Sequence, residues 1–343
     1  MPIDWQPLLE IISAHERFVI TSHVRPDADA IGSEIGLATF LQNRGKQVRI
    51  VNPSQTPNHL QFLDPNGLIQ KIGTDVSIES CCDTDVHIIV DTSAWQQLQE
   101  VGTALKQTQA RKVVIDHHLS SDDLGAAEFK DITAAAAGVL VTELIEASGD
   151  SFTPVQATAL FAAIATDTGW FRFSNSDSRT FNTAARLVDR GVEPNTLYRV
   201  LYERSSLARL KLQAIALNRV SLACHGQLAH TYVTQKDFAE TGAHPSDTED
   251  LVNICLSIDG VESAFILVEQ PEGQAKGSLR SRSRISVAAV AEQFGGGGHR
   301  QAAGTMLPGP LLEAQAKLLD AFAVAFEHLN NEHRVTSGEP LTA

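Results

Sequence analysis

Acidic and histidine side chains follow several short apolar segments of the chain, a pattern that suits divalent metal chemistry. In chain order these residues are His23, Asp27, Asp29, Asp91, Asp116, His117, His118 and Asp167. Carboxylate oxygen with imidazole nitrogen, and no thiolate, suits Mn²⁺ or a similar ion better than structural zinc. The five carboxylates would repel one another in a single crevice, and two divalent cations would remove that repulsion.

Each of these residues also has an ordinary structural explanation. An aspartate after a strand often caps the next helix, and helix capping by itself would explain either Asp27 or Asp29. A single histidine is usually a surface or core residue, and the chain has 12 of them. The recurrence of metal-capable residues at successive segment ends favours one shared site.

The elements that must position these residues form an alternating pattern of strands and helices. The candidate strands are 18–21, 48–51, 86–90 and 113–115, with a helical pattern over 31–41 and alanine-rich helices near 133–148 and 154–166. This alternation predicts an α/β fold with a doubly wound, mostly parallel sheet. The carboxyl ends of parallel strands meet at one edge, with neighbouring strands ~4.8 Å apart, so the metal-capable side chains can meet there.

The chain of 343 residues is long enough for about two domains at ~150 residues each. We expect a catalytic domain over 1–190, a helical linker over 191–222, a smaller C-terminal α/β domain over 223–329 and a flexible tail over 330–343. In the second domain the patterns predict strands at 228–234, 261–269 and 276–286 and helices at 247–257 and 287–294.

Three arginines alternate with small residues in the second domain, at Arg280, Arg282 and Arg284. On one regular strand their side chains would share a face. Guanidinium groups pair with phosphate oxygens through two parallel hydrogen bonds, so this face could grip a phosphate. A solvated basic edge that prevents sheet aggregation is the alternative.

A run of four glycines, 295–298, precedes His299 and Arg300. Glycine lets backbone N–H groups converge on an anion, and the two following side chains add donors. A helix C-cap after 287–294 is the alternative explanation, although four glycines are more than a cap requires.

Composition narrows the class of protein. The net charge of −14 argues against a protein that coats long nucleic acid, and 6% aromatic residues give no extended base-stacking platform. No apolar stretch reaches the ~18 residues of a membrane span, and the first residues lack a signal-peptide pattern. The four cysteines have no metal-binding spacing. We therefore expect a reduced, cytoplasmic protein that is not bound to a membrane.

These motifs together resemble those of the DHH phosphoesterases. The resemblance rests on His23-x3-Asp27-x-Asp29, Asp91, Asp116-His117-His118 and Asp167, and on Gly295–Gly298-His299 with Ala302-Ala303-Gly304, which looks like the DHH-associated C-terminal domain. It covers nearly the whole chain. Ala28 departs from the glycine that many members carry, and alanine also fits the start of a helix.

The resemblance implies roles for individual residues. One metal would be held by His23, Asp27 and Asp91, and the other by Asp29, Asp91, His117 and Asp167, with Asp91 bridging. Asp116 would orient the histidine ligands, and His118 would face the substrate phosphate. Arg280, Arg282, Gly296, Gly297, Gly298 and His299 would contact the substrate. The two ions would be Mn²⁺, with Mg²⁺ or Co²⁺ as alternatives.

The resemblance also implies an activity: a metal-activated water hydrolyses phosphate esters in short oligoribonucleotides and in 3′-phosphoadenosine 5′-phosphate (pAp). The alternatives are a phosphodiesterase for cyclic or linear dinucleotides, an inorganic pyrophosphatase, and a nucleotide- or RNA-binding regulator without catalysis. The glycine-rich second domain argues against the pyrophosphatase. The expected partners are short oligoribonucleotides and small nucleotides, without long duplex nucleic acid, and the oligomeric state stays open, with a homodimer as one option.

Overall fold

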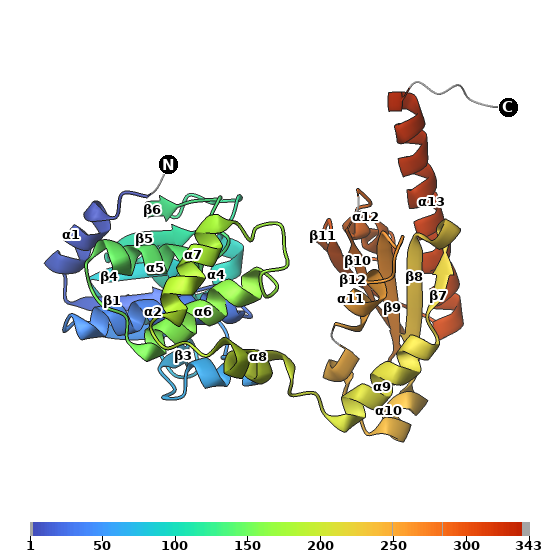
Figure 1. The fold of residues 1–343 in the computed structure, drawn as a ribbon, viewed down its shortest axis with the longest axis horizontal. Coiled ribbons are helices and arrows are strands. Elements are labelled where there is room, and N and C mark those ends of the chain that lie inside the picture. The colour runs from blue at the N-terminus through green and yellow to red at the C-terminus, as the bar shows by residue number, and fades with distance from the viewer. Residues whose placement is uncertain (1–2, 249, 283, 338–343) are drawn as a thin grey trace. The chain divides into compact units, whose positions relative to one another are not determined.

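The computed structural model describes residues 3–248, 250–282 and 284–337, and the chain forms two compact units that divide between Arg204 and Ser205 (Figure 1). The elements of the first unit are α1 Gln6–Ala14, β1 Arg17–Thr21, α2 Ala28–Asn43, β2 Gln47–Asn52, the 3₁₀ helix η1 Asn58–Leu63, β3 Ile69–Lys71, α3 Ile78–Cys82, β4 Val86–Val90, α4 Trp95–Gln107, β5 Arg111–Asp116, β6 Ala127–Lys130, α5 Ala137–Ala147, α6 Pro154–Asp167, α7 Ser178–Val188 and α8 Pro194–Tyr202.

The first unit is built on a six-stranded sheet in the order β3-β2-β1-β4-β5-β6. All the pairings between these strands are parallel, and β1 pairs with β4 in the register Phe18↔Val86 and Ile20↔Ile88. The strand order reverses direction between β1 and β4, and α/β proteins bind ligands at the carboxyl ends of the strands beside such a switch point. The α/β fold with a mostly parallel sheet is therefore confirmed.

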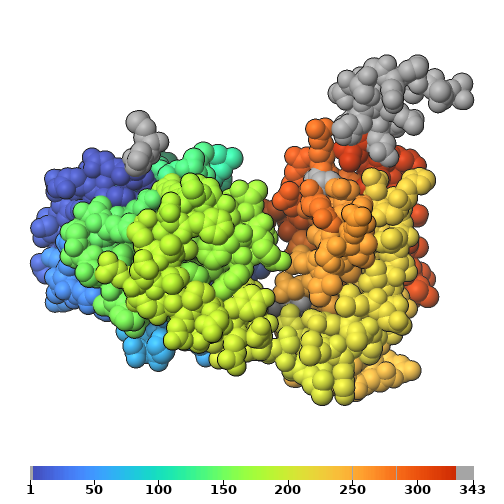
Figure 2. Space-filling view, in the orientation of Figure 1, coloured from blue at the N-terminus to red at the C-terminus, as the bar shows by residue number. Residues whose placement is uncertain are grey.

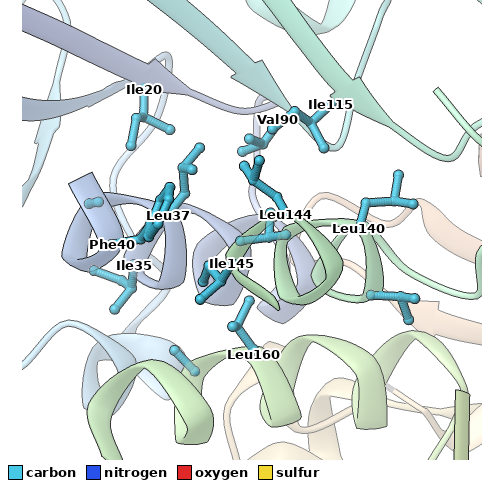
Figure 3. Packing of buried hydrophobic residues seen from close by; sticks show 14 of the residues in the cluster. Ile20, Ile35, Leu37, Phe40, Val90, Ile115, Leu140, Leu144, Ile145 and Leu160 are labelled. Atoms are coloured by element: carbon cyan, nitrogen blue, oxygen red, sulfur yellow. The ribbon is translucent and has the colours of Figure 1, made fainter. Parts of the chain in front are cut away.

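Helices cover both faces of this sheet. On one face α2 and α5 lie between the strands and α6, with Leu37 and Leu144 directed at the sheet and Leu160 behind them (Figure 3). Helices α2 and α6 approach closely because Gly32 has no side chain: a Cβ there would lie 2.3 Å from the carbonyl oxygen of Ala159. The outer helices of this side, coloured yellow-green, cover part of the visible face of the first unit in Figure 2.

The opposite face of the sheet packs against α3 and α4. Alternate residues of the central strands, such as Val19, Ile89 and Val114, contact Leu98 and Leu105 there, and all five are fully buried. Strands buried on both faces have almost continuous apolar sequences, which is why 86–90 and 113–115 are recognisable in the sequence. The sheet is thus a rigid frame for the loops at its carboxyl edge.

The second unit also contains a six-stranded sheet, in the order β11-β12-β10-β9-β8-β7. Its elements are α9 Leu207–Asn218, β7 Ser221–Ala223, η2 Cys224–Gly226, β8 Leu228–Val233, α10 Gln235–Thr241, η3 Pro245–Thr248, α11 Leu251–Leu256, β9 Ser263–Glu269, β10 Ala275–Ser281, α12 Val287–Glu292, β11 Gly297–His299, β12 Ala302–Leu307 and α13 Leu311–Ser337. Strands β8 and β9 are parallel, and the other pairs are antiparallel. Helices α12 and α13 contribute to the core on one face, and α9 and α11 to the core on the other.

The structure corrects several sequence predictions. The strand predicted over 276–286 is wrong at its end, because β10 stops at Ser281. Helix α13 continues to Ser337, into the predicted tail 330–343, and residues 338–343 lie outside the described residues, so the flexible tail stays a prediction. The short edge strands β3 and β6 are additions that the sequence did not predict. The domain bounds 1–190, 191–222 and 223–329 stay a prediction.

Within residues 3–248, 250–282 and 284–337, no helix combines the length and apolar character needed to cross a bilayer.

Candidate metal centre

The loops after β1, β4 and β5, the start of α2 and the end of α6 bring the predicted ligands together around Asp91. The two carboxylate oxygens of Asp91 face different histidines. Oδ2 lies 3.4 Å from Nε2 of His23, and Oδ1 lies 3.3 Å from Nε2 of His117. Asp91 therefore stands between the two histidines, in the position that a bridging carboxylate requires.

Further carboxylates complete two groups on either side of Asp91. Asp27 lies 3.9 Å from Nε2 of His23, while Asp29 and Asp167 lie 3.6 Å and 3.8 Å from Nε2 of His117. Two sets of mutually close ligand atoms result: His23, Asp27 and Asp91, and Asp29, His117 and Asp167. Asp91, His117 and His118 form a third set.

The burial and hydrogen bonding of Asp91 indicate whether these residues fit a cation. Its side chain is almost completely buried, and its Oδ1 has no hydrogen-bond donor among the described residues. Leaving a buried carboxylate oxygen unpaired is costly, and a bound cation removes that cost. Asp91 also has a positive φ of 60°, a conformation that non-glycine residues adopt at some cost in energy and that is enriched at functional sites. The donor set thus fits divalent metal ions.

The local fold explains how the carboxylates of α2 are held. Oδ1 of Asp27 accepts hydrogen bonds from the backbone N–H groups of Asp29 and Ala30, so Asp27 is the N-cap of α2 as well as a member of the cluster. Asp29 accepts hydrogen bonds from the backbone N–H groups of Ala137 and Gly138, at 2.7 and 2.9 Å. The start of α5 therefore fixes Asp29 beside His117.

The clustered carboxylates strongly perturb the two histidines. Burial alone would lower the pKa of His23, but its contacts with Asp27 and Asp91 outweigh burial and raise the pKa to about 11. Burial likewise opposes protonation of His117, and its contacts with Asp91 and Asp29 raise that pKa to about 10. Both shifts come from carboxylates crowded around the imidazoles, and a divalent cation bound there would take the place of the proton on each ring.

The pKa values of two of the carboxylates are raised as well, which favours their neutral form. Burial, reinforced by the charge of Asp91, raises the pKa of Asp29 well above its usual value. Burial also raises the pKa of Asp167, to about 6. Both shifts reflect acidic groups held close together and away from water, the arrangement that divalent cations relieve.

Asp116 lies beneath the cluster and holds His118. Its Oδ1 lies 2.8 Å from Nδ1 of His118, and its Oδ2 accepts a hydrogen bond from Oγ of Ser93 at 2.5 Å. Burial would raise the pKa of Asp116, but the hydrogen bonds from His118 and Ser93 lower it to about 2. The side chain of His118 is 50% exposed, so Asp116 fixes a histidine that faces solvent beside Asp91.

Two polar supports of this site were missed by sequence reasoning. Lys130 of β6 donates to Oγ of Ser93 at 3.1 Å and lies 3.5 Å from Oδ2 of Asp116.

Glu34 of α2 is fully buried, and the amide of Asn52 donates to its Oε2 at 2.9 Å, while Asn52 accepts from the N–H of Ser22. Burial raises the pKa of Glu34 to about 8. In the sequence, Glu34 could have been noticed as an acidic residue within the apolar helical pattern 31–41.

The predicted arginines lie in the second unit, and they do not share one strand. Arg280 is on β10, half-buried, and its Nη1 donates to the carbonyl oxygen of Leu279. Arg282 follows the strand and donates through Nη2 to the carbonyl oxygen of Ile258. Arg284 is exposed beyond it, and Ser283 lies outside the described residues. Among the described residues, none of these three arginines forms an ion pair with a carboxylate.

The glycine run has structural reasons at three of its four positions. Gly295 has a φ of +73° and ends the helical segment that begins with α12. A Cβ on Gly296 or Gly298 would lie 2.3 or 2.5 Å from backbone oxygens of the neighbouring strand. Gly297 has open space around its Cα and an ordinary φ, and His299 is exposed on β11. The C-cap explanation thus holds for Gly295.

The sequence matches two family descriptions in chain order. Residues 17–166 match the DHH family, N-terminal domain, and residues 225–327 match the DHHA1 domain. The bifunctional oligoribonuclease and PAP phosphatase NrnA of Thermus thermophilus is 31% identical over 91% of both chains. The chain therefore belongs to the DHH family of phosphoesterases. It is therefore a hydrolase of the phosphoesterase class.

Other relatives agree with this assignment. The protein of the same name from Bacillus subtilis is 25% identical over 88% of this chain and 92% of its own. The cyclic-di-AMP phosphodiesterase PdeA of Listeria monocytogenes is 25% identical over 92% of this chain, but only 49% of PdeA is matched. An exopolyphosphatase-related protein of Bacteroides fragilis has the same fold, with a TM-score of 0.85 and 27% identity over 94% of this chain and 95% of its own.

Proposed function

We propose that the chain hydrolyses phosphate esters in short oligoribonucleotides and in pAp with the help of two divalent metal ions. The observation that carries this proposal is Asp91, whose two oxygens face His23 and His117 at 3.4 and 3.3 Å. The relatives named as oligoribonuclease and PAP phosphatase, which match this chain over nearly its whole length, support the choice of substrate.

In this proposal His23, Asp27 and Asp91 hold one ion, and Asp29, Asp91, His117 and Asp167 hold the other. Mn²⁺ is the preferred ion and Mg²⁺ or Co²⁺ the alternatives, because the ligands are carboxylates and imidazoles. When bound, a pair of divalent cations lowers the pKa of water and stabilises negative charge on phosphoryl oxygens.

The protein's own residues then orient the substrate. The hydrogen bond to Asp116 raises the pKa of His118, and in the protonated ring Nδ1–H is paired with Asp116 while Nε2–H is left to donate to a phosphoryl oxygen of the substrate. Removing a single donor of this kind typically lowers kcat by about 10²–10³-fold. No serine, cysteine or histidine needs to form a covalent intermediate.

The second unit supplies the proposed contacts to the rest of the substrate. Arg280 is the strongest candidate, because its guanidinium forms no ion pair within the described residues and shares the exposed face of β10 with Lys276. Arg282, the backbone at Gly296–Gly298 and the side chain of His299 are the further proposed contacts. Of the glycines, Gly297 is the one that neither its φ nor its neighbours explain, so a substrate contact would account for it.

A phosphodiesterase for cyclic dinucleotides is the second candidate. The relative PdeA supports it through its name, although the match covers only about half of that protein. A non-catalytic nucleotide-binding regulator is the third candidate. The complete cluster of His23, Asp91 and His117 argues against it, because a binding protein has no need to gather buried carboxylate and imidazole groups so closely.

One assay distinguishes these candidates. The purified chain is incubated with Mn²⁺ and, separately, with a short RNA, pAp and a cyclic dinucleotide, and the products are separated by chromatography. Hydrolysis of RNA and pAp supports the proposal, and the Asp91→Ala variant should lose it while remaining folded. Preferential hydrolysis of the cyclic dinucleotide would favour the second candidate. No hydrolysis of any ester at full metal occupancy would leave only the regulator.

A further inference from the structure

The turn that follows Asp167 has an unusual backbone. Gly169, Trp170 and Phe171 have φ values of +56°, +59° and +62° in succession. Left-handed conformations cost roughly 1–2 kcal/mol for each non-glycine residue, so interactions elsewhere must maintain this turn. Trp170 and Phe171 provide them, because both rings pack against Phe161 with centroid distances of 6.0 and 5.8 Å.

The same turn leaves Phe173 exposed on the segment that follows the proposed ligand Asp167. Phe173 is 54% exposed, and among the described residues its ring pairs with no other aromatic ring. The tip of the ring lies over Gly169, where a Cβ would be only 2.4 Å from it. Gly169 is two residues from the proposed ligand Asp167. The side chain of Asn175 donates to the carbonyl oxygens of Asp167 and Ala135, which fixes the turn next to the cluster.

Other exposed apolar side chains follow the ligand-bearing segments. Leu119 is 83% exposed and comes directly after His118. Ile132 is 56% exposed, two residues before Ala134, whose carbonyl oxygen lies 3.2 Å from Nδ1 of His117. Each of these side chains therefore lies on a loop that also carries or supports a member of the metal cluster. Apolar groups of this size at a phosphate-binding site have no role toward the phosphate itself.

From this arrangement we infer that Phe173 stacks on the nucleobase of the nucleotide whose phosphate is bound at the Asp91 cluster. The inference rests on the proposed function, and it adds a residue that determines specificity for nucleotides over other phosphate esters. Every nucleobase offers a flat π-face close to its phosphate, and aromatic side chains that stack on bases contribute about 1–3 kcal/mol each. A single exposed ring suits a substrate of one or a few nucleotides.

Kinetics with two substrates test this inference. The substrates are pAp and the ribose bisphosphate that lacks adenine, and the variants are Phe173→Ala, Phe173→Leu and Phe173→Tyr. Both non-aromatic variants should lower kcat/KM for pAp by about 5- to 100-fold, mainly through KM, and leave the base-free ester unchanged. Phe173→Tyr should retain the wild-type preference. Phe173→Leu preserves an apolar contact with Gly169, so the result does not depend on the truncated variant folding normally.

Val155→Ala is the control, because Val155 is 56% exposed in the same unit and lies at the opposite end of α6 from Asp167. Equal losses on both substrates, or no loss in Phe173→Ala, would overturn the inference. An equal loss of pAp preference in Val155→Ala would also overturn it. If the wild type hydrolyses neither ester, the proposed function fails. In that case the affinity for pAp is measured by calorimetry for the wild type and for Phe173→Leu. The same Kd for both proteins would refute the inference.

Discussion

His87 makes the stability of the first unit dependent on pH. It is the second residue of β4, is fully buried, and neither of its ring nitrogens has a hydrogen-bond partner among the described residues. Burial, with smaller contributions from Arg49 and Lys112, lowers its pKa from 6.5 to about 3. Because the folded-state pKa lies below the unfolded one, the stability associated with neutral His87 is present above pH 6.5. It is lost progressively as the pH falls toward 3.

The size of the effect follows from proton linkage. Between pH 7 and pH 5 the unfolded chain takes up a proton at His87 while the folded chain does not, which lowers the free energy of unfolding by about 2 kcal/mol. Leucine at this position is similar in bulk, does not titrate and has no unpaired nitrogens. His87→Leu should therefore lose about 2 kcal/mol less stability than the wild type over this pH interval. It should also be more stable by about 1–3 kcal/mol at pH 7.

Urea unfolding of the full chain at pH 7, 6 and 5, followed by circular dichroism, measures this difference. His59→Leu is the control, because His59 is exposed and its substitution should leave the pH dependence of the wild type unchanged. If wild type and His87→Leu lose stability in parallel, within about 0.5 kcal/mol, the assignment of a buried neutral histidine is wrong.

Other predictions concern the site itself. Asp116→Asn should lower kcat by about 10- to 100-fold with little change in Mn²⁺ affinity, because it weakens the orientation of His118; a parallel loss of Mn²⁺ binding in dialysis would contradict this. Glu34→Ala should lower the free energy of unfolding by about 1–3 kcal/mol by leaving the amide of Asn52 unpaired, whereas Glu34→Gln should be nearly neutral; equal denaturation midpoints for the two variants would refute it. Arg280→Ala should raise KM several-fold at unchanged kcat, and unaltered steady-state kinetics would remove Arg280 from the substrate contacts.

The candidate site was predictable because its residues follow strands that are easy to recognise. Central parallel strands are buried on both faces, so 86–90 and 113–115 have apolar sequences with a sharp end. Asp91, and Asp116 with His117, stand at or just after those ends, and the rule that parallel strands share one carboxyl edge predicts that they meet. The structure brings them together as expected, with Asp91 between His23 and His117.

The second unit shows where the sequence was insufficient. An alternating pattern of arginines predicts a continuous strand, but it does not reveal where the strand loses its partners. Strand β10 ends at Ser281, although the backbone N–H of Arg282 still donates to the carbonyl oxygen of Glu262 in the register of β9, and Arg284 lies further beyond that end. The supports of the site were hidden for a related reason. Glu34 and Lys130 act through contacts with residues far away in the sequence, and such contacts leave no local pattern.

The number of Mn²⁺ ions bound per chain tests the central claim most directly. Equilibrium dialysis followed by metal analysis should give two ions for the wild type and for Asp83→Ala, whose exposed carboxylate lies outside the cluster. Asp91→Ala should lose both ions, because Asp91 faces both ligand groups. Two ions bound as tightly by Asp91→Ala as by the wild type, or none bound by the wild type, would contradict the account.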